Sequence, residues 1–177
     1  METRLSISGN RKVLKASRID TPLGPMLAIA DEKALYLLEF AERRSLEREI
    51  EQLLQKAKGA IIPGTTQPIE SIKNELAQYF EQGLCKFHTP LFLMGTPFQK
   101  SVWEELQKIP PGETRSYMEI AKAIGKPKGF RAVARANGSN QLAIVIPCHR
   151  VIKANGEIGG YAAGIDTKKS LLALEKR

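Results

Sequence analysis

The first half of the chain alternates short apolar runs with turn-forming residues. Three such runs lie close together, and they cover residues 13–19, 26–30 and 34–40. Apolar runs of this length, separated by tight turns, predict strands that pair as antiparallel neighbours. Ile61 and Ile62 predict a further short strand. The pattern therefore predicts a small antiparallel sheet.

Two amphipathic segments lie on either side of the last predicted strand. Residues 43–58 carry leucine and isoleucine at helical spacing among charged residues, which is typical of a helix with one buried face. A second helix is predicted to begin after its cap residue Thr66 and to end at Gly83. We expect both helices to cover the sheet.

The second half of the chain predicts three further helices. They cover residues 97–109, 116–124 and 128–138. Thr96 caps the first of them, and Ser116 with Glu119 forms a capping box at the start of the second. The second and third helices are short and are joined by a glycine-containing turn. This arrangement predicts a helix-turn-helix.

A continuous apolar run, Leu142–Ile146, precedes Pro147, Cys148 and His149. Such a run predicts a buried strand, and proline ends its pairing because it lacks a backbone donor. The next segments, residues 150–153 and 157–161, predict a strand and a glycine-rich return that form the hairpin wing of a winged helix.

The last predicted element is a helix that reaches Glu175. Asp166 or Thr167 is expected to cap its start.

The chain has 177 residues, with 27 Lys and Arg against 19 Asp and Glu, so its net charge is +8. This length allows one domain or two small ones, and the positive charge favours an anionic partner such as nucleic acid. Basic residues gather without any acid between positions 121 and 136: Lys122, Lys126, Lys128, Arg131 and Arg135. The cluster predicts phosphate binding, although a solvated basic helix face has the same composition.

Cys85 and Cys148 are the two cysteines, and His88 and His149 are the two histidines. Their spacing implies neither a disulfide framework nor a metal site, so we expect no metal and no cofactor. We interpret Cys85 and His88 as linker residues. Without a secretory signal or a long apolar run, the sequence predicts a soluble cytoplasmic protein with no membrane contact.

Cys148 has two interpretations. A lone cysteine is most often a small buried core residue. A thiol beside an imidazole, as in Cys148-His149, is also the pairing of a nucleophile with its base. A nucleophile near a DNA-binding module suggests covalent chemistry on DNA, and reaction at a base edge requires that the base leave the stack.

These motifs resemble those of the O6-alkylguanine-DNA alkyltransferases, of the bacterial Ogt type and the C-terminal half of Ada. The resemblance is close over residues 95–177 and weak over residues 1–90. Its motifs are Pro147-Cys-His-Arg-Val151, Thr96-Pro-Phe-Gln, Val102-Trp103, Gly112-Glu-Thr, Ser116-Tyr117, Gly125-Lys-Pro-Lys128 and Arg131-Ala-Val133.

The resemblance implies a role for each of five catalytic residues. Cys148 would accept the alkyl group from guanine O6 in one displacement. His149 would act as its base through a water, held in place by Glu175. Asn140 would stabilise the turn around Cys148, and Tyr117 would help to rotate the nucleotide and to protonate the leaving guanine. The alternatives are that Glu175 is a surface acid, Asn140 a turn former and Tyr117 a core aromatic.

The resemblance also implies binding residues. Arg131 would enter the base stack and fill the gap, and Tyr117 would crowd the phosphate. The other expected DNA contacts are Lys128, Gly129, Ala132 and Arg135, and the expected pocket residues are Val151, Tyr161, Ala162 and Ala163.

Three features depart from relatives. Ala162 stands where some relatives carry a serine that donates to guanine O6. No cysteine precedes Cys85, so the N-terminal zinc site of other relatives is not expected. Phe130 stands where human-type relatives have small residues, which leaves the packing in the groove open.

We therefore expect an α+β protein with an RNase H-like N-terminal domain over residues 1–90 and a winged helix-turn-helix domain over residues 91–177. Its expected activity is single-turnover repair of O6-alkylguanine, and of O4-alkylthymine, in double-stranded DNA. We expect a monomer without an obligate protein partner. The alternatives are a DNA-binding damage sensor without alkyl transfer, and a cysteine hydrolase that turns over.

Overall fold

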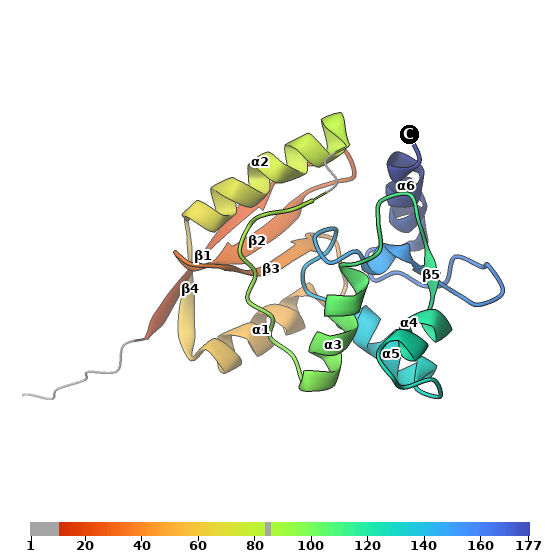
Figure 1. The fold of residues 1–177 in the computed structure, drawn as a ribbon. Helices are drawn as coiled ribbons and strands as arrows, with labels where there is room; N and C mark the ends of the chain where they lie inside the picture. The colour runs from red at the N-terminus through yellow and green to blue at the C-terminus, as the bar shows by residue number, and fades with distance from the viewer. Residues whose placement is uncertain (1–10, 84–85) are drawn as a thin grey trace, which may run out of the picture.

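The computed structural model describes residues 11–83 and 86–177. Our expectations for the first ten residues and for Cys85 lie outside the described residues. Within them, the fold combines a four-stranded sheet, two helices that pack on it and a second group of helices beside it (Figure 1).

The sheet has the order β3-β2-β1-β4. Its strands are β1 (Lys12–Ile19), β2 (Met26–Ala30), β3 (Leu35–Phe40) and β4 (Gly59–Pro63). The first three pair antiparallel as predicted, but β4 pairs with β1 in parallel, so the prediction of a purely antiparallel sheet was wrong. The reason is that α1 (Leu46–Ala57) intervenes between β3 and β4 and returns the chain to the far edge in the direction of β1.

Helices α1 and α2 (Gln67–Gln82) lie on opposite sides of the sheet (Figure 1). The Thr66 side chain accepts from the backbone N–H of Ile69, and α2 ends at Gly83 in the left-handed conformation, as predicted. Leu53 of α1 packs in a smaller apolar cluster with Leu14 of β1. The face under α2 belongs to the larger core, which continues into the second half of the chain.

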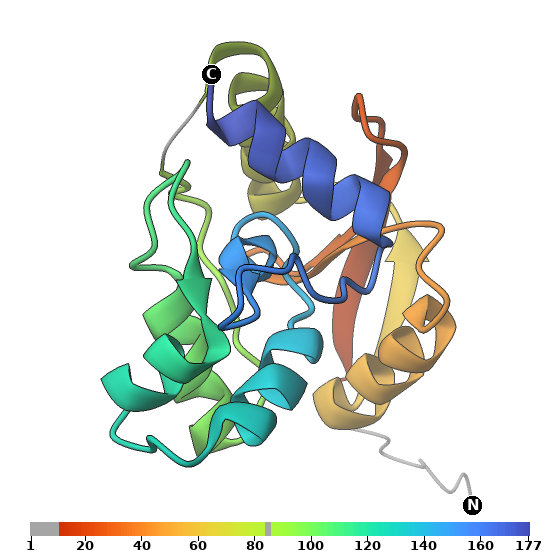
Figure 2. The same cartoon turned by 90° about the vertical axis from the view of Figure 1, so that its right-hand side faces the viewer.

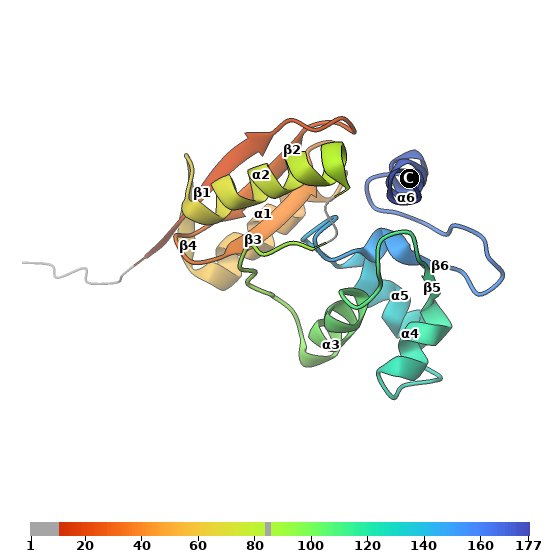
Figure 3. The same ribbon diagram turned by 45° about the horizontal axis from the view of Figure 1, so that its top comes forward.

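The second group of helices comprises α3 (Pro97–Leu106), α4 (Tyr117–Ala123) and α5 (Phe130–Gly138). They lie beside the sheet rather than on its faces (Figure 3). Thr96 and Ser116 form capping boxes with Gln99 and Glu119, which confirms both predicted helix starts. Helix α3 ends three residues before the predicted boundary.

Residues 142–146 are buried as predicted, but they do not form the predicted strand. Leu142 makes one isolated bridge with Leu38, and the chain then turns through Ile144, whose φ is 72°. The side chain of Asn140 explains the difference, because it accepts from Leu142 N and donates to Ile146 O, backbone groups that a strand would use in its ladder.

The predicted hairpin wing is absent from the described residues. Strand β6 (Val151–Ile152) pairs in parallel with β5 (Arg115–Ser116), and no second strand follows it. The return segment makes a turn instead, with Gly156 and Gly159 at positive φ and one bond from Lys153 N to Glu157 O.

Helix α6 (Ile165–Glu175) ends at the predicted residue, but its N-cap is Gly164 rather than Asp166 or Thr167. Helix α6 lies close to the turn formed by residues 148–150. Figure 2 shows this turn, in light blue, between α6 and α5. None of the described helices is both long enough and apolar enough to span a membrane.

Candidate active site around Cys148

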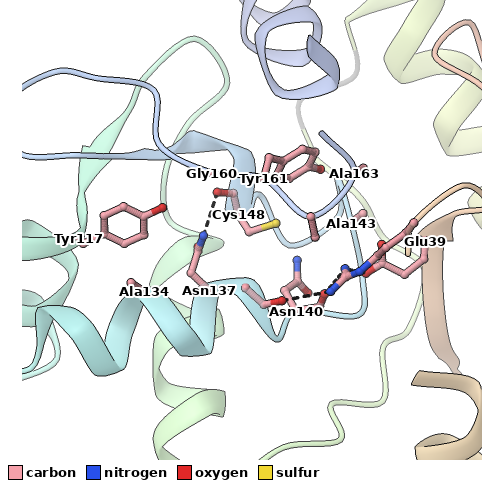
Figure 4. Close-up of a pocket in the computed structure, with 13 residues that line it drawn as sticks. Glu39, Tyr117, Ala134, Asn137, Asn140, Ala143, Cys148, Gly160, Tyr161 and Ala163 are labelled. Carbon is pink, nitrogen blue, oxygen red and sulfur yellow. Dashed lines mark hydrogen bonds and ion pairs between the residues drawn. The ribbon is translucent and has the colours of Figure 1, made fainter. Parts of the chain in front are cut away.

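Cys148 begins a short 3₁₀ turn, η1 (Cys148–Arg150), and opens onto a cavity of about 290 Å³. The cavity is lined by residues from β3, α4, α5, the turn and the loop before α6. Figure 4 shows the Cys148 sulfur between the Tyr117 ring on one side and Glu39 on the other. Cys148 is 7% exposed, and it lines this cavity.

Burial raises the pKa of the Cys148 thiol to about 11. The hydrogen bond with the Asn140 side chain and the nearby cations Arg43 and Lys168 oppose this shift, and the Glu39 carboxylate adds to it. Because the thiol pKa lies well above neutral pH, resting Cys148 carries its proton.

Two asparagines hold the backbone around the thiol. Asn140 is 2% exposed, and its Nδ2 donates to Ile146 O at 2.9 Å while its Oδ1 accepts from Leu142 N at 2.9 Å. Asn137 Nδ2 donates to Cys148 O at 3.3 Å. The turn that presents the thiol is therefore fixed by side chains at the end of α5 and just after it.

His149 and Glu175, which are 26 positions apart, meet in the structure. His149 Nε2 lies 2.7 Å from Glu175 Oε1, and the imidazole is completely buried. Burial lowers the pKa of His149 although Glu175 opposes this, so the imidazole is neutral. Burial alone would raise the pKa of Glu175, but hydrogen bonds from His149 and Arg150 lower it to about 2.

A carboxylate only accepts hydrogen bonds, so His149 Nε2 must carry the ring proton and donate a hydrogen bond to Glu175. The other nitrogen, Nδ1, is then an acceptor. It has no hydrogen-bond partner within the described part of the chain. The imidazole is therefore oriented with its basic atom free.

Arg150 completes the charge balance around Glu175. Its Nε donates to Oε2 at 2.9 Å and its Nη2 to Oε1 at 2.8 Å, while Nη1 donates to Ile109 O at 2.6 Å. Tyr79 of α2 also donates to Glu175 Oε1, at 2.7 Å. The buried carboxylate thus binds donors from two distant parts of the chain.

Arg43 links the first half of the chain to the Cys148 turn. Its guanidinium donates to Glu39 at 2.6 Å and pairs with Glu49 at 2.6 Å. It also donates to the carbonyl oxygens of Gly138 at 3.1 Å and Asn140 at 3.3 Å. With a further bond from Nε to the Ser45 hydroxyl, all three guanidinium nitrogens have partners.

Three of the four predicted pocket residues line the cavity. Tyr161, Ala162 and Ala163 line the cavity with Tyr117, whose ring is half-buried. Val151 does not line it: its side chain is buried, and its carbonyl accepts from the buried Lys168 Nζ at 2.7 Å.

Of the predicted DNA-binding residues, Tyr117 lines the cavity, and the other five lie outside it, along the turn before α5 and on α5 itself. Lys128, Arg131 and Arg135 are exposed, whereas Gly129 and Ala132 are half-buried. The Arg131 guanidinium lies over the ring of Phe130, 5.7 Å from its centre. None of these five predicted residues lines the cavity, but Ala134 of α5 does.

Sequence reasoning missed several site residues, namely Glu39, Arg43, Tyr79, Asn137, Arg150 and Lys168. Some carried a signal: Glu39 is the one acid within an apolar strand, and Arg150 directly follows His149. Tyr79 falls within the second predicted helix, next to apolar residues, and its hydroxyl gives no separate signal there. No group of three metal-ligating side chains occurs within residues 11–83 and 86–177.

Known proteins resemble the chain over most of its length. A family model described as 6-O-methylguanine DNA methyltransferase, DNA binding domain, matches residues 97–177. A methylated-DNA–protein-cysteine methyltransferase of Methanosarcina mazei is 44% identical over 162 residues, which cover 89% of this chain and 94% of that protein. The protein of the same name from Mycobacterium tuberculosis H37Rv is 43% identical over 158 residues, covering 89% and 90%.

Solved structures agree with these relatives. The crystal structure of Mycobacterium tuberculosis OGT in complex with DNA superposes with a TM-score of 0.78 at 40% identity, covering 93% of each chain. The resemblance inferred from the sequence motifs is thereby confirmed. The chain belongs to the methylated-DNA–protein-cysteine methyltransferases and is an enzyme of that class.

Proposed function

We propose that this protein repairs O6-alkylguanine in duplex DNA by moving the alkyl group to Cys148. The observation that carries the proposal is the buried Cys148 thiol on a cavity of about 290 Å³, next to a histidine whose free nitrogen is oriented by Glu175. The DNA complex of the Mycobacterium tuberculosis relative supports DNA as the partner.

In the proposed reaction, the Cys148 proton passes through a water to His149 Nδ1. The sulfur attacks the alkyl carbon, so a sulfur–carbon bond forms while the bond from that carbon to guanine O6 breaks. The electron pair of the broken bond stays on the guanine, which takes a proton with help from Tyr117. Asn140 keeps the thiol turn in place, and Glu175 stabilises the imidazolium that forms.

The target base must leave the duplex to reach a thiol that is this deeply buried. In our proposal α4 and α5 act as a helix-turn-helix, with α5 against the DNA groove and Arg131 filling the space left by the flipped nucleotide. Lys128 and Arg135 bind phosphates, while Gly129 and Ala132 allow close approach of the backbone. All three cations are exposed, which supports this assignment.

The thioether formed at Cys148 is stable in water at neutral pH, so each molecule reacts once. We further propose that O4-alkylthymine is accepted, that residues 1–90 form an RNase H-like domain, that residues 91–177 form the DNA-binding and acceptor domain, and that the protein acts as a cytoplasmic monomer. The family model for a DNA binding domain, which matches residues 97–177, supports this division.

The test is mass spectrometry of the protein after incubation with a duplex that holds one O6-methylguanine. We expect one methyl group on the peptide with Cys148, and none in Cys148→Ala, which still binds the duplex. An unmodified wild-type protein that binds the duplex would instead support a non-catalytic damage sensor.

A further inference from the structure

Tyr79 connects the first half of the chain to the reaction centre at a single atom. Its hydroxyl lies 2.7 Å from Glu175 Oε1, the same oxygen that lies 2.7 Å from His149 Nε2. Tyr79 belongs to α2, 96 positions from Glu175, and its side chain is 1% exposed. Helix α2, which covers the sheet, thus supplies a hydrogen-bond donor to the Glu175–His149 pair.

The direction of the Tyr79 bond is fixed by chemistry. The Glu175 carboxylate can only accept, so the phenol must donate. Burial and the nearby Glu175 charge raise the pKa of Tyr79 well above its ordinary value, so the phenol keeps its proton over the working pH range. Tyr79 is therefore a permanent donor to Oε1.

A donor at this position has two effects on His149. It restricts the carboxylate to the orientation in which Oε1 faces the imidazole. It also takes up part of the negative charge on Oε1, which would otherwise stabilise the imidazolium form more strongly. Besides Glu175, the charged groups that act on His149 are Arg150 of the same turn and Lys168 of α6.

We propose that Tyr79 is a positioning residue for alkyl transfer, acting through Glu175 to hold His149 with its free nitrogen ready to accept the Cys148 proton. The proposal rests on the proposed function of His149 as the base. It gives α2 a part in the reaction in addition to its packing on the sheet.

The test is Tyr79→Phe, which removes one oxygen atom and keeps the ring in the apolar core. Tyr36→Phe is the matched control, because it removes a buried strand hydroxyl that bonds Asp31 at 3.0 Å, away from the cavity. Single-turnover methyl transfer from an O6-methylguanine duplex is measured from pH 5 to pH 9. The titration of the His149 imidazole, which needs no DNA, is followed by NMR over the same range.

General-base catalysis contributes roughly 100- to 10,000-fold, and Tyr79 is one of three side chains that hold Glu175, so we expect Tyr79→Phe to slow transfer roughly three- to tenfold. The acid limb of the rate profile should move to higher pH, because Glu175 then stabilises the imidazolium more strongly. The Tyr36→Phe profile should match the wild type.

A Tyr79→Phe protein with the wild-type transfer rate, pH profile and imidazole titration would overturn the proposal and leave the proposed function intact. A loss of stability alone, with an unchanged rate per folded molecule, would likewise overturn it. If the wild type transfers no methyl group, the proposed function fails, and the imidazole titration decides the role of Tyr79: a His149 pKa that is higher in Tyr79→Phe than in the wild type supports it, and an unchanged one refutes it.

Discussion

Glu175→Gln tests whether one buried carboxylate holds the site together. The substitution keeps the size of the side chain but removes its charge and replaces one acceptor oxygen with a donor nitrogen. Arg150, which is 5% exposed, then lies buried without its anion, and His149 loses its acceptor or faces an amide. Tyr79 is affected in the same way, because it donates to the same oxygen as His149.

The expected loss of stability can be worked out in two ways. The pKa of Glu175 falls from an ordinary 4.5 to about 2, which corresponds to roughly 2–3 kcal/mol at neutral pH after allowance for solvent screening. Breaking a buried ion pair by removing one partner costs about 3–5 kcal/mol. Both values lead us to expect that Glu175→Gln lowers the free energy of unfolding by roughly 3 kcal/mol.

The pH dependence makes the prediction specific. A carboxyl whose pKa is lowered in the folded state contributes its full stability above the unfolded value of 4.5, and loses it as the pH falls towards about 2. The difference between wild type and Glu175→Gln should therefore be constant from pH 7 to pH 5 and shrink by more than half at pH 3.

Urea unfolding followed by circular dichroism at pH 7, 5, 4 and 3 measures this difference. Glu157→Gln is the control, because Glu157 also has a lowered pKa and pairs with Lys153 at 2.8 Å, but on the surface. We expect no measurable change for it. A Glu175→Gln protein that loses less than about 1 kcal/mol at pH 7, or the same amount at pH 3 as at pH 7, would refute the reasoning.

Three further predictions follow from the same geometry. Arg43→Met should lower the free energy of unfolding by about 3–5 kcal/mol, because buried Glu39 loses its partner. Urea unfolding measures this loss, and Arg44→Met, at an exposed position, is the control. Equal losses in the two variants would contradict the prediction. Asn140→Ala should cost about 1–3 kcal/mol for each buried backbone group left unpaired, measured in the same way. The alkylation rate of Cys148 by iodoacetamide should keep rising above pH 9, since burial raises the thiol pKa to about 11; a plateau below pH 8 would show that the resting thiol is already ionised.

Local chemistry made most helices predictable from the sequence. Thr66, Thr96 and Ser116 each form a side-chain cap within the first turn of the helix that follows, so a short window of sequence holds the whole interaction. The apolar faces of α1 and α2 follow from helical spacing. The direction of β4 could not be predicted, because a strand's apolar pattern is the same whether its neighbour is parallel or antiparallel.

The segment before Cys148 shows why an apolar run can mislead. Leu142–Ile146 has the composition of a buried strand, and it is buried. Its backbone partners come from the Asn140 side chain, however, and composition does not show which hydrogen bonds a buried backbone makes. Burial was therefore predictable and conformation was not.

In the candidate site, too, one part was predictable from the sequence and another was not. Cys148, His149 and Arg150 are adjacent, so the sequence showed them together. The partners of this turn come from far along the chain: Glu175 was placed there by resemblance, and Tyr79 was missed. Contacts at such separations depend on how whole elements pack, which no local pattern contains.

The arrangement explains how a buried thiol can be held unreactive until its substrate arrives. With a pKa of about 11, roughly one Cys148 in ten thousand is ionised at pH 7. Small alkylating agents in solution therefore meet a neutral thiol in a narrow cavity. In the proposed reaction, a flipped guanine fills that cavity and places its alkyl carbon beside the sulfur, and His149 removes the proton as the bond forms. Glu175 and Arg43 hydrogen-bond the segments around Cys148. In the proposed reaction, the energy of DNA binding therefore serves to bring the base to the thiol rather than to order the thiol.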